Sequence, residues 1–296
     1  MENVILPSLE TQIVVDLLVK RLGPCTIFAF GYLNTITSVS GLLPTQLHSE
    51  TTQHHFDILV LSAKAFPNGA SNLANAIAEQ SGKTITVSVL LHKVTDLATK
   101  QASQQWFFDQ VFRYGERLSL DTTASPYLLN HRPTRNIEGD RIYWFKCVGV
   151  AQFHLNAATE SEQLEVALCK IALLHTACEQ IALGLLRVFL GYTPNEFGLK
   201  YLLQLCGSFT DLPSQLFHQQ TPEAIQRYKM LCAPLGMLHH WTRLTAPEQD
   251  FDWLLDACEV FLKQANAIAL IELERLEDTF NPLGVIQVFS FKHLET

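Results

Sequence analysis

The chain has 296 residues, 48% apolar and only 17% charged, a balance that favours a packed globular protein of two domains over a disordered chain. Its net charge of −8, with no Lys/Arg cluster beyond the scatter of Arg132, Arg135 and Arg141, disfavours extended binding to nucleic acid. No uncharged apolar run reaches the ~20 residues of a membrane span. The N-terminus carries the acidic Glu2 and no long apolar run, so we expect no signal peptide. The seven cysteines form no CxxC pair, so we expect free thiols in the cytoplasm.

The first third of the chain alternates between helical and strand-like patterns. Apolar residues at helical spacing predict a helix over residues 10–22, which Gly23-Pro24 ends. The polar, turn-rich residues 32–54 predict a loop. The further predicted elements are strands over 26–30, 56–61 and 84–91 and helices over 72–80 and 106–115. This order predicts a small α/β domain with a mixed sheet over residues 1–124.

A linker over residues 125–140 separates this domain from a helical one, because Pro126, Pro133 and Gly139 gather there with several charges. Residues 141–280 predict an all-α bundle. Its predicted helices cover 141–158, 161–190, 195–206, 222–243 and 248–277. Residues 281–296 are different, because their β-rich sequence predicts a terminal strand that docks on a sheet, such as that of the first domain.

The first domain resembles a nucleotidyltransferase of the minimal type, on a strand that ends at Gly31 and a following strand that carries Asp57. In that family a Gly-Ser pair grips phosphates, two acids two residues apart hold metal, and a third acid stands on a later strand. Two Mg²⁺ ions about 4 Å apart need several carboxylates. Here Tyr32 replaces the serine, His55 stands at the first acid, and strand 84–91 has no acid. These departures imply that nucleotidyl transfer is lost.

Gly31, Tyr32 and Asp57 remain candidates for binding a ligand without catalysis. Gly31 would let a phosphate approach the backbone, and Tyr32 would stack on a base. In the alternative interpretation, Gly31-Tyr32 is a strand-ending turn and Asp57 caps a loop. No cofactor is expected, apart from Mg²⁺ if a nucleotide binds.

A group of histidines precedes Asp57. His54, His55 and Asp57, with His48 and Glu50 nearby, are candidate ligands for Zn²⁺. The segment has no HxH or HxxxH spacing, however, and this favours a solvated histidine-rich loop.

The predicted helix 161–190 has one continuous apolar face with a histidine in its middle. Glu179 follows His175 by four residues and is within its reach. The two residues are either an acid–base pair in a pocket or a buried histidine with a local hydrogen-bond partner. The face consists of Leu164, Leu168, Ile171, His175, Cys178, Ala182, Leu185 and Phe189.

From Arg141 to Leu276 the chain resembles HEPN domains fused behind nucleotidyltransferase-like domains. The Leu-His-x-Ala-x-Glu run at 174–179 and the Phe-Leu-Gly-Tyr-Thr-Pro break at 189–194 carry this resemblance. Many HEPN domains are metal-independent ribonucleases that need an arginine four to six residues before a histidine. No histidine here has that spacing, and before His175 only Lys170 offers a cation, without the planar fork of arginine.

Related HEPN proteins also tend to have a Thr-His pair after the proline of the break, where this chain has Glu196 and Phe197. Three interpretations follow. The first, which we favour, is a non-catalytic nucleotide-binding or regulatory protein that forms a homodimer through the bundle. The second is an RNA-processing enzyme with a site rebuilt from His175, Glu179 and Lys170. The third is a structural homodimer without a small ligand, which the high apolar content supports.

Overall fold

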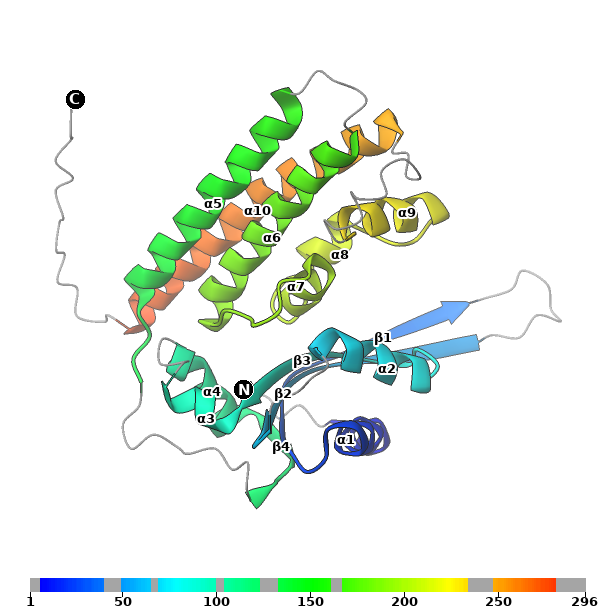
Figure 1. Ribbon diagram of the computed structural model, residues 1–296, viewed down its shortest axis with the longest axis vertical. Coiled ribbons are helices and arrows are strands. Elements are labelled where there is room, and N and C mark those ends of the chain that lie inside the picture. Colours follow the sequence, from blue (N-terminus) through cyan, green and yellow to red (C-terminus); the bar gives the residue numbers. More distant parts are fainter. Residues whose placement is uncertain are drawn as a thin grey trace.

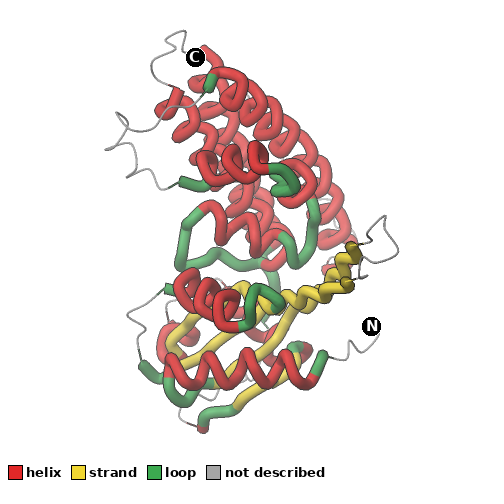
Figure 2. Tube along the Cα trace, turned by 90° about the vertical axis from the view of Figure 1, so that its right-hand side faces the viewer, coloured by secondary structure: helices red, strands yellow, loops and turns green. Residues whose placement is uncertain are grey.

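The computed structural model describes residues 6–39, 49–64, 69–99, 104–122, 133–160, 167–233 and 247–280. A four-stranded sheet and its helices form one part of the molecule, and a bundle of longer helices lies above it (Figure 1, Figure 2). The expected combination of a mixed α/β sheet with a helical region is therefore present.

The sheet has the strand order β3-β2-β1-β4, in which β2 and β3 are parallel and the other neighbours are antiparallel. Helix α2 connects the two parallel strands and packs on β3, and α1 contacts α2 and β4. The elements are α1 (Ser8–Leu22), β1 (Thr26–Val39), β2 (Ser49–Ser62), α2 (Ala70–Gln80), β3 (Ile85–Lys93), α3 (Val94–Thr99), α4 (Gln105–Tyr114) and β4 (Glu116–Ser119).

The loop predicted over residues 32–54 is wrong at residues 32–39 and 49–54, whereas residues 40–48 lie outside the described residues. Strands β1 and β2 continue through the two described parts as an antiparallel ribbon, in which Tyr32 pairs with Phe56 and Val39 pairs with Ser49. The segment is polar but rich in threonine, and β-branched residues favour extended backbone whether or not they are buried. The cross-strand ladder satisfies the backbone, so this part of the hairpin forms without an apolar pattern.

The helical region is built around α6 (Ala167–Leu190), which packs between its neighbours. Helix α7 contacts both α6 and β3 and so lies between the bundle and the sheet. The helix α5 begins four residues before the predicted start at 141. The other helices are α5 (Ile137–Glu160), α7 (Leu199–Cys206), α8 (Leu212–Leu216), α9 (Pro222–Leu231) and α10 (Glu248–Phe280).

Five predictions fall partly or wholly outside the described residues. These are the middle of the predicted loop 32–54, the first part of the predicted linker 125–140, the start of the predicted helix 161–190, the end of the predicted helix 222–243 and the predicted C-terminal strand over residues 281–296. The short helices α3 and α8 were not predicted, because segments of five or six residues are too short to give a helical period.

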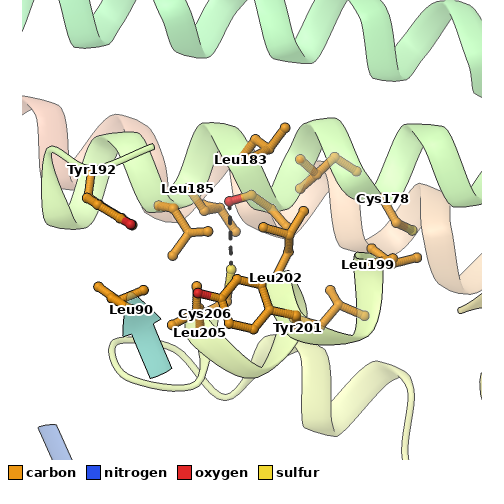
Figure 3. Close-up of a cluster of buried hydrophobic side chains, with 14 of the residues drawn as sticks. Leu90, Cys178, Leu183, Leu185, Tyr192, Leu199, Tyr201, Leu202, Leu205 and Cys206 are labelled. Carbon is orange, nitrogen blue, oxygen red and sulfur yellow. Dashed lines mark hydrogen bonds between the residues drawn. The ribbon is translucent and has the colours of Figure 1, made fainter. Parts of the chain in front are cut away.

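Most side chains of α6 are buried, which explains its composition. Within the described residues, Leu168–Leu190 is long and apolar enough to cross a membrane, but 61% of its most apolar window is buried inside the fold. This burial is what a core helix requires, since α5, α7 and α10 all pack against α6. Figure 3 shows α6 and α7 meeting through leucines, with Cys206 beneath α6.

Helices α5 and α6 approach closely at Gly184. A Cβ atom at this position would lie 2.5 Å from Cε3 of Trp144 and 3.1 Å from Cβ of Cys147. Trp144 is fully buried and its indole N–H donates to Asn266 Oδ1 at 3.1 Å, so the ring has no room to move away.

We expect Gly184→Ala to destabilise the protein by about 1–3 kcal/mol through overpacking. Gly149, on α5, is the matched control, because a Cβ there meets nothing within 4 Å. Gly149→Ala should raise stability by about 0.5–1 kcal/mol, as expected for a helical glycine. Denaturant titrations would measure both changes, and equal effects of the two substitutions would contradict this account.

Candidate functional site

The central feature of the sheet is the contact between Gly31 and Asp57, which are cross-strand partners on β1 and β2. The register of β1 shifts between Ala29 and Gly31, so Gly31 lies at a bulge inside the strand. The prediction that the strand ends at Gly31 is therefore wrong. A Cβ atom at this position would collide with Oδ2 of Asp57. The glycine therefore makes room for the carboxylate of its own neighbour, and Asp57 is buried over it.

The ring of His55 contacts Asp57 and two hydroxyl side chains on the same face of the sheet. Nε2 of His55 lies 3.3 Å from Oδ1 of Asp57 and 2.9 Å from Oγ of Ser88, and Nδ1 of His55 lies 2.8 Å from Oγ1 of Thr86. Thr86 and Ser88 are the β3 partners of His55 and Asp57, so sheet register alone brings these groups together. We call His55, Asp57, Thr86 and Ser88 the His55 cluster.

The His55 cluster does not have the donors of a two-metal site. It contributes one carboxylate, and that carboxylate already faces an imidazole and the backbone of Gly31. Mg²⁺ prefers oxygen ligands and needs several of them. Among the residues that the structure describes, no group of three or more His, Cys, Asp or Glu side chains is placed to hold a metal ion. These residues do not fit the metal pair of a nucleotidyltransferase.

Tyr32 and His54 lie on the opposite face of the sheet from Asp57. Tyr32 pairs with Phe56, and successive residues of a strand point to opposite faces. The hydroxyl of Tyr32 lies 2.7 Å from Nδ1 of His54, whose Nε2 lies 3.8 Å from Glu10 of α1. The structure therefore brings Gly31 and Asp57 together but separates Tyr32 from them, and the trio His54, His55 and Asp57 does not converge. His48 lies outside the described residues.

The segment from Gly191 to Gly198 joins α6 to α7 and packs against residues of β3 and α4. Gly191 has a φ of 63°, and Tyr192 follows it into the interior, where it is 1% exposed. Its ring packs 4.7 Å from that of Phe107 on α4. The amide of Thr193 donates to Oε1 of Gln104 at 3.3 Å. We call residues 191–198 the docking segment.

His92, at the end of β3, receives the docking segment. Its Nε2 lies 2.8 Å from the hydroxyl of Tyr192, and its Nδ1 lies 3.4 Å from Nδ2 of Asn195. Burial lowers the pKa of His92 to about 4, and the nearby Asp96 opposes this effect only in part. The neutral ring is satisfied at both nitrogens, whereas a proton at Nδ1 would face the amide donor of Asn195.

Glu196 of the docking segment caps helix α2, which packs on the sheet. Its carboxylate accepts from the amide of Ala70, and also from the amide and hydroxyl of Ser71 at 3.2 and 2.9 Å. The helix has no capping side chain of its own, since its N-cap residue is Gly69. A negative charge at a helix N-terminus is favourable, so Glu196 both caps α2 and fastens the docking segment to it.

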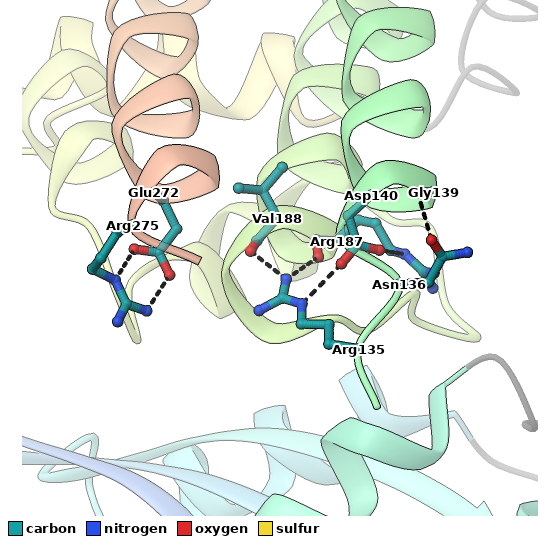
Figure 4. Close-up of polar contacts among 8 residues, drawn as sticks. All are labelled: Arg135, Asn136, Gly139, Asp140, Arg187, Val188, Glu272 and Arg275. Atoms are coloured by element: carbon teal, nitrogen blue, oxygen red, sulfur yellow. Dashed lines mark hydrogen bonds and ion pairs between the residues drawn. The ribbon is translucent and has the colours of Figure 1, made fainter. Parts of the chain in front are cut away.

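A buried ionic group holds the linker to the bundle beside the docking segment (Figure 4). Nε of Arg135 donates to Asp140 at 2.8 Å, and Arg187 donates to the other oxygen of Asp140 at 2.6 Å. Arg135 also donates to the carbonyl oxygens of Arg187 and Val188, at the end of α6, and lies 4.8 Å over the ring of Trp106. Arg135 is thus internal and unsuited to nucleic-acid binding.

The candidate site on α6 is not assembled as a catalytic group. Nδ1 of His175 lies 2.8 Å from the carbonyl oxygen of Leu231, and its Nε2 lies 3.7 Å from Glu179. Glu179 does reach His175, as the spacing predicts, and burial raises the pKa of Glu179. Lys170 lies 5.0 Å over the ring of Phe251 instead of beside the histidine. The geometry is that of a buried histidine tied to a backbone carbonyl.

All seven cysteines are free thiols, as expected from their number and spacing. Cys178 of α6 and Cys258 of α10 lie with their sulfur atoms 3.3 Å apart in the core, where burial raises the pKa of Cys178. Such thiols fill space in the core as small apolar groups.

Sequence reasoning missed the buried pairing of His92 with Tyr192. A histidine at the carboxyl end of a parallel strand was the available signal, because ligands and partner segments gather at that edge of α/β sheets. Comparisons with family models, with curated proteins and with solved structures found no significant match to this chain.

We expect the stability of the protein to fall as the pH decreases from about 6.5 to about 4. In this range the unfolded chain protonates His92 while the folded protein, with its pKa of about 4, does not, so protons favour unfolding. The loss should reach about 3 kcal/mol, the 2.5-unit difference converted at 1.36 kcal/mol per unit.

Denaturant titrations at pH 7, 5.5 and 4.5 would measure this loss for the native chain and for His92→Gln, which does not titrate. The variant should be less stable at pH 7 but should show a shallower decline toward acid. Identical pH profiles for the two proteins would mean that His92 does not make this contribution.

Proposed function

We propose that this protein is a non-catalytic regulatory protein of the nucleotidyltransferase/HEPN type, which binds a nucleotide on its sheet domain. The observation that carries the proposal is the His55 cluster. At the position of the first metal-binding acid, His55 donates to or accepts from hydroxyls and approaches the single carboxylate of Asp57. A pair of carboxylates would attract Mg²⁺, which prefers oxygen ligands. An imidazole in place of one of the two carboxylates does not.

The same cluster supports the binding part of the proposal. The side chain of His55 is 23% exposed, and Thr86 beside it is also partly exposed. Both nitrogens of His55 already have hydroxyl partners, so a ligand would meet the face of the ring, on which a base can stack, and the Thr86 hydroxyl, whose oxygen can accept a further hydrogen bond. Such recognition requires no metal, so the proposed binding is independent of Mg²⁺.

The ribonuclease alternative has less support. His175 would have to move a proton, but its Nδ1 lies against the carbonyl of Leu231 and a suitably placed arginine is missing from its helix. Lys170, the substitute cation, faces Phe251. The contacts of His175 and Lys170 therefore favour the non-catalytic proposal over a ribonuclease.

A thermal-shift measurement with ATP, ADP and AMP tests the proposal. A nucleotide at 100 times its dissociation constant adds about 2.7 kcal/mol, which should raise the Tm by roughly 5 °C. We expect the same shift with Mg²⁺ and with EDTA. His55→Ala should remove it, whereas Tyr32→Phe, on the opposite face, should keep it.

Two results would contradict the proposal. A native protein whose Tm is unchanged by every nucleotide has no such site. A shift that requires Mg²⁺ and survives in His55→Ala would place the ligand elsewhere and revive a metal-dependent function.

We also propose that two copies pair through the helical bundle. Val260 and Ile271 are 38% and 66% exposed on α10, and they lie on one side of this helix with Gln264 and Ala267 between them. Apolar side chains at the surface of the bundle are suited to an isologous contact between identical helices.

The pairing is tested by sedimentation velocity. The native chain should sediment as a dimer at micromolar concentration, and Ile271→Glu should shift it to the monomer because two charges would then meet across the two-fold axis. Leu9→Glu is the control, since Leu9 is similarly exposed at 68% but lies on α1 of the other domain. A native monomer, or dimers unaffected by Ile271→Glu, would refute this interface.

A further inference from the structure

The paired strands β1 and β2 extend past the rest of the sheet as a two-stranded ribbon. Strand β4 pairs with β1 only as far as Ala29, and β3 pairs with β2 only from His54 onward. Within the part of the chain that the structure describes, residues 32–39 of β1 therefore have a strand neighbour on one side alone. We call their other side the β1 edge. Figures 1 and 2 show the ribbon projecting from the body of the molecule.

The hydrogen bonds of β2 show which groups of β1 point to this edge. The amide of His54 donates to the carbonyl oxygen of Thr84 at 2.8 Å, on the side of β2 that faces β3. Opposite residues of an antiparallel pair either bond each other or both point away. Asn34, the partner of His54, therefore directs its N–H and C=O to the β1 edge. The two-residue period of a strand gives the same direction to every second residue from Tyr32 to Ser38.

The sequence of the β1 edge contains none of the features that keep strand edges apart. Exposed edges are commonly protected by charged side chains, by proline or by a bulge. Residues 32–39 contain no charge and no proline, and the bulge at Gly31 precedes them. An uncharged segment rich in β-branched residues has the composition that pairs with further strands. A ribbon of two strands is also only marginally stable in water, so another strand would stabilise it.

The occupant that the β1 edge fits is the β1 edge of a second copy. A foreign peptide that adds a strand is selected by pockets beside the edge. The side chains of Leu33, Asn34 and Thr35 are exposed and do not form the walls of such a pocket. Identical strands need no pocket, because antiparallel pairing about a two-fold axis matches the strand to itself. The chain has a net charge of −8, but this strand is uncharged, so no like charges meet at the contact.

We propose that two copies pair antiparallel through their β1 edges, about a two-fold axis beside Thr35. In this register Asn34 faces the partner's Ile36, and Tyr32 faces the partner's Ser38. It is the register in which all outward N–H and C=O groups of these four residues are paired, in about eight hydrogen bonds. Thr35 faces the partner's Thr35 as a non-hydrogen-bonded pair, with Cα atoms about 4.5 Å apart. Cross-strand threonine pairs are favourable.

The pairing joins the two sheets into one. Leu33 is the cross-strand partner of His55, so the two side chains share a face of the sheet. A two-fold axis perpendicular to the sheet keeps this face, and the His55 clusters of both copies then lie on it about 20 Å apart, from strand spacing and rise. The contact does not depend on nucleotide binding, and it does not use the exposed residues of α10.

Disulfide trapping tests the proposal. Thr35→Cys is introduced together with Cys169→Ser, because Cys169 is an exposed native thiol. The protein is oxidised with a small disulfide, and a non-reducing denaturing gel separates single chains from covalent dimers. Cα atoms about 4.5 Å apart lie within the range that a disulfide spans, so we expect covalent dimers as the main product. The crosslink traps the contact even where the paired state is a minor species.

Two further cysteine positions serve as controls in the same background. Gln53 is the exposed β2 partner of Thr35 and lies away from the axis, so Gln53→Cys should give at least tenfold less dimer. In the proposed register the Cα atoms of Asn34 in the two copies are about 8 Å apart, beyond the reach of a disulfide. Asn34→Cys should therefore give at least fivefold less dimer. Equal yields at the three positions, or no dimer from Thr35→Cys, would overturn the proposal.

A backbone variant tests whether the edge itself makes the contact. The N–H of Asn34 points outward, so Asn34→Pro leaves the pairing of β1 with β2 intact but removes an edge donor. Asn34→Ala keeps the N–H and is the matched control. In the Thr35→Cys chain, proline should lower the dimer yield at least fivefold and alanine should leave it within twofold. Circular dichroism checks that both variants remain folded, and equal yields would show that edge hydrogen bonds do not join the copies.

A last variant separates this contact from pairing through the bundle. Ile271→Glu, which is expected to disrupt the contact between α10 helices, should leave the dimer yield of Thr35→Cys within twofold. Loss of the crosslink in Ile271→Glu would show that the copies meet only through the bundle, and the proposed edge pairing would then be wrong.

Discussion

The burial of Tyr192 against His92 is the interaction on which the packing of the helical region against the sheet depends. Gly191 turns the chain with a positive φ, and Trp106 and Arg135 lie so close that a Cβ there would be crowded. Tyr192 is then directed toward the sheet, where its buried hydroxyl requires a partner, and His92 supplies it at 2.8 Å. Burial of both groups costs too much for either to be left unpaired, so the sheet and the bundle are held together at this point.

Once the docking segment is in place, its neighbours close the edge of the sheet. Glu196 reaches the N-terminus of α2, and the hydroxyl of Tyr201 on α7 donates to the carbonyl of Val89 at 2.9 Å. Burial, aided by nearby acidic groups, raises the pKa of Tyr201, which therefore stays a neutral donor. The carboxyl edge of β2 and β3, where ligands of α/β sheets commonly bind, is thus occupied by the protein's own side chains. Figure 3 shows Leu90 facing Tyr192 and Tyr201 at this junction.

The sequence predicted the parts of the fold that carry an apolar period. The helix at 10–22, the strands around 28, 58 and 88, and the long helices of the bundle are all present, because buried faces leave a pattern of 3.6 or 2 residues. The ribbon formed by residues 32–39 and 49–54 carries no such pattern, since backbone pairing with little burial leaves none. The prediction that Tyr32 lies beside Gly31 and Asp57 was also wrong. The strand continues past Gly31, and consecutive side chains of a strand point to opposite faces of the sheet.

The sequence identified residues of the candidate site but not how they meet. It pointed to His55 and Asp57 as neighbours two residues apart on one strand, and in the structure His55 lies 3.3 Å from Asp57. The replacement contacts were not predictable, because Thr86 and Ser88 reach His55 only through the pairing of β2 with β3. Glu196 was noted as a departure from a Thr-His pair, but its contact with α2 spans 126 residues and has no local signal.

Under the proposed function, His55 explains how Asp57 can be retained without a metal. A buried carboxylate needs charge-compensating or hydrogen-bonding partners, and in a nucleotidyltransferase the cations would supply them. Here the imidazole of His55 lies 3.3 Å from Asp57, while Ser88 and Thr86 hold the ring at both nitrogens. On this proposal, a histidine at the position of the first acid removes the need for a cation, because its imidazole is the partner that the buried Asp57 carboxylate requires.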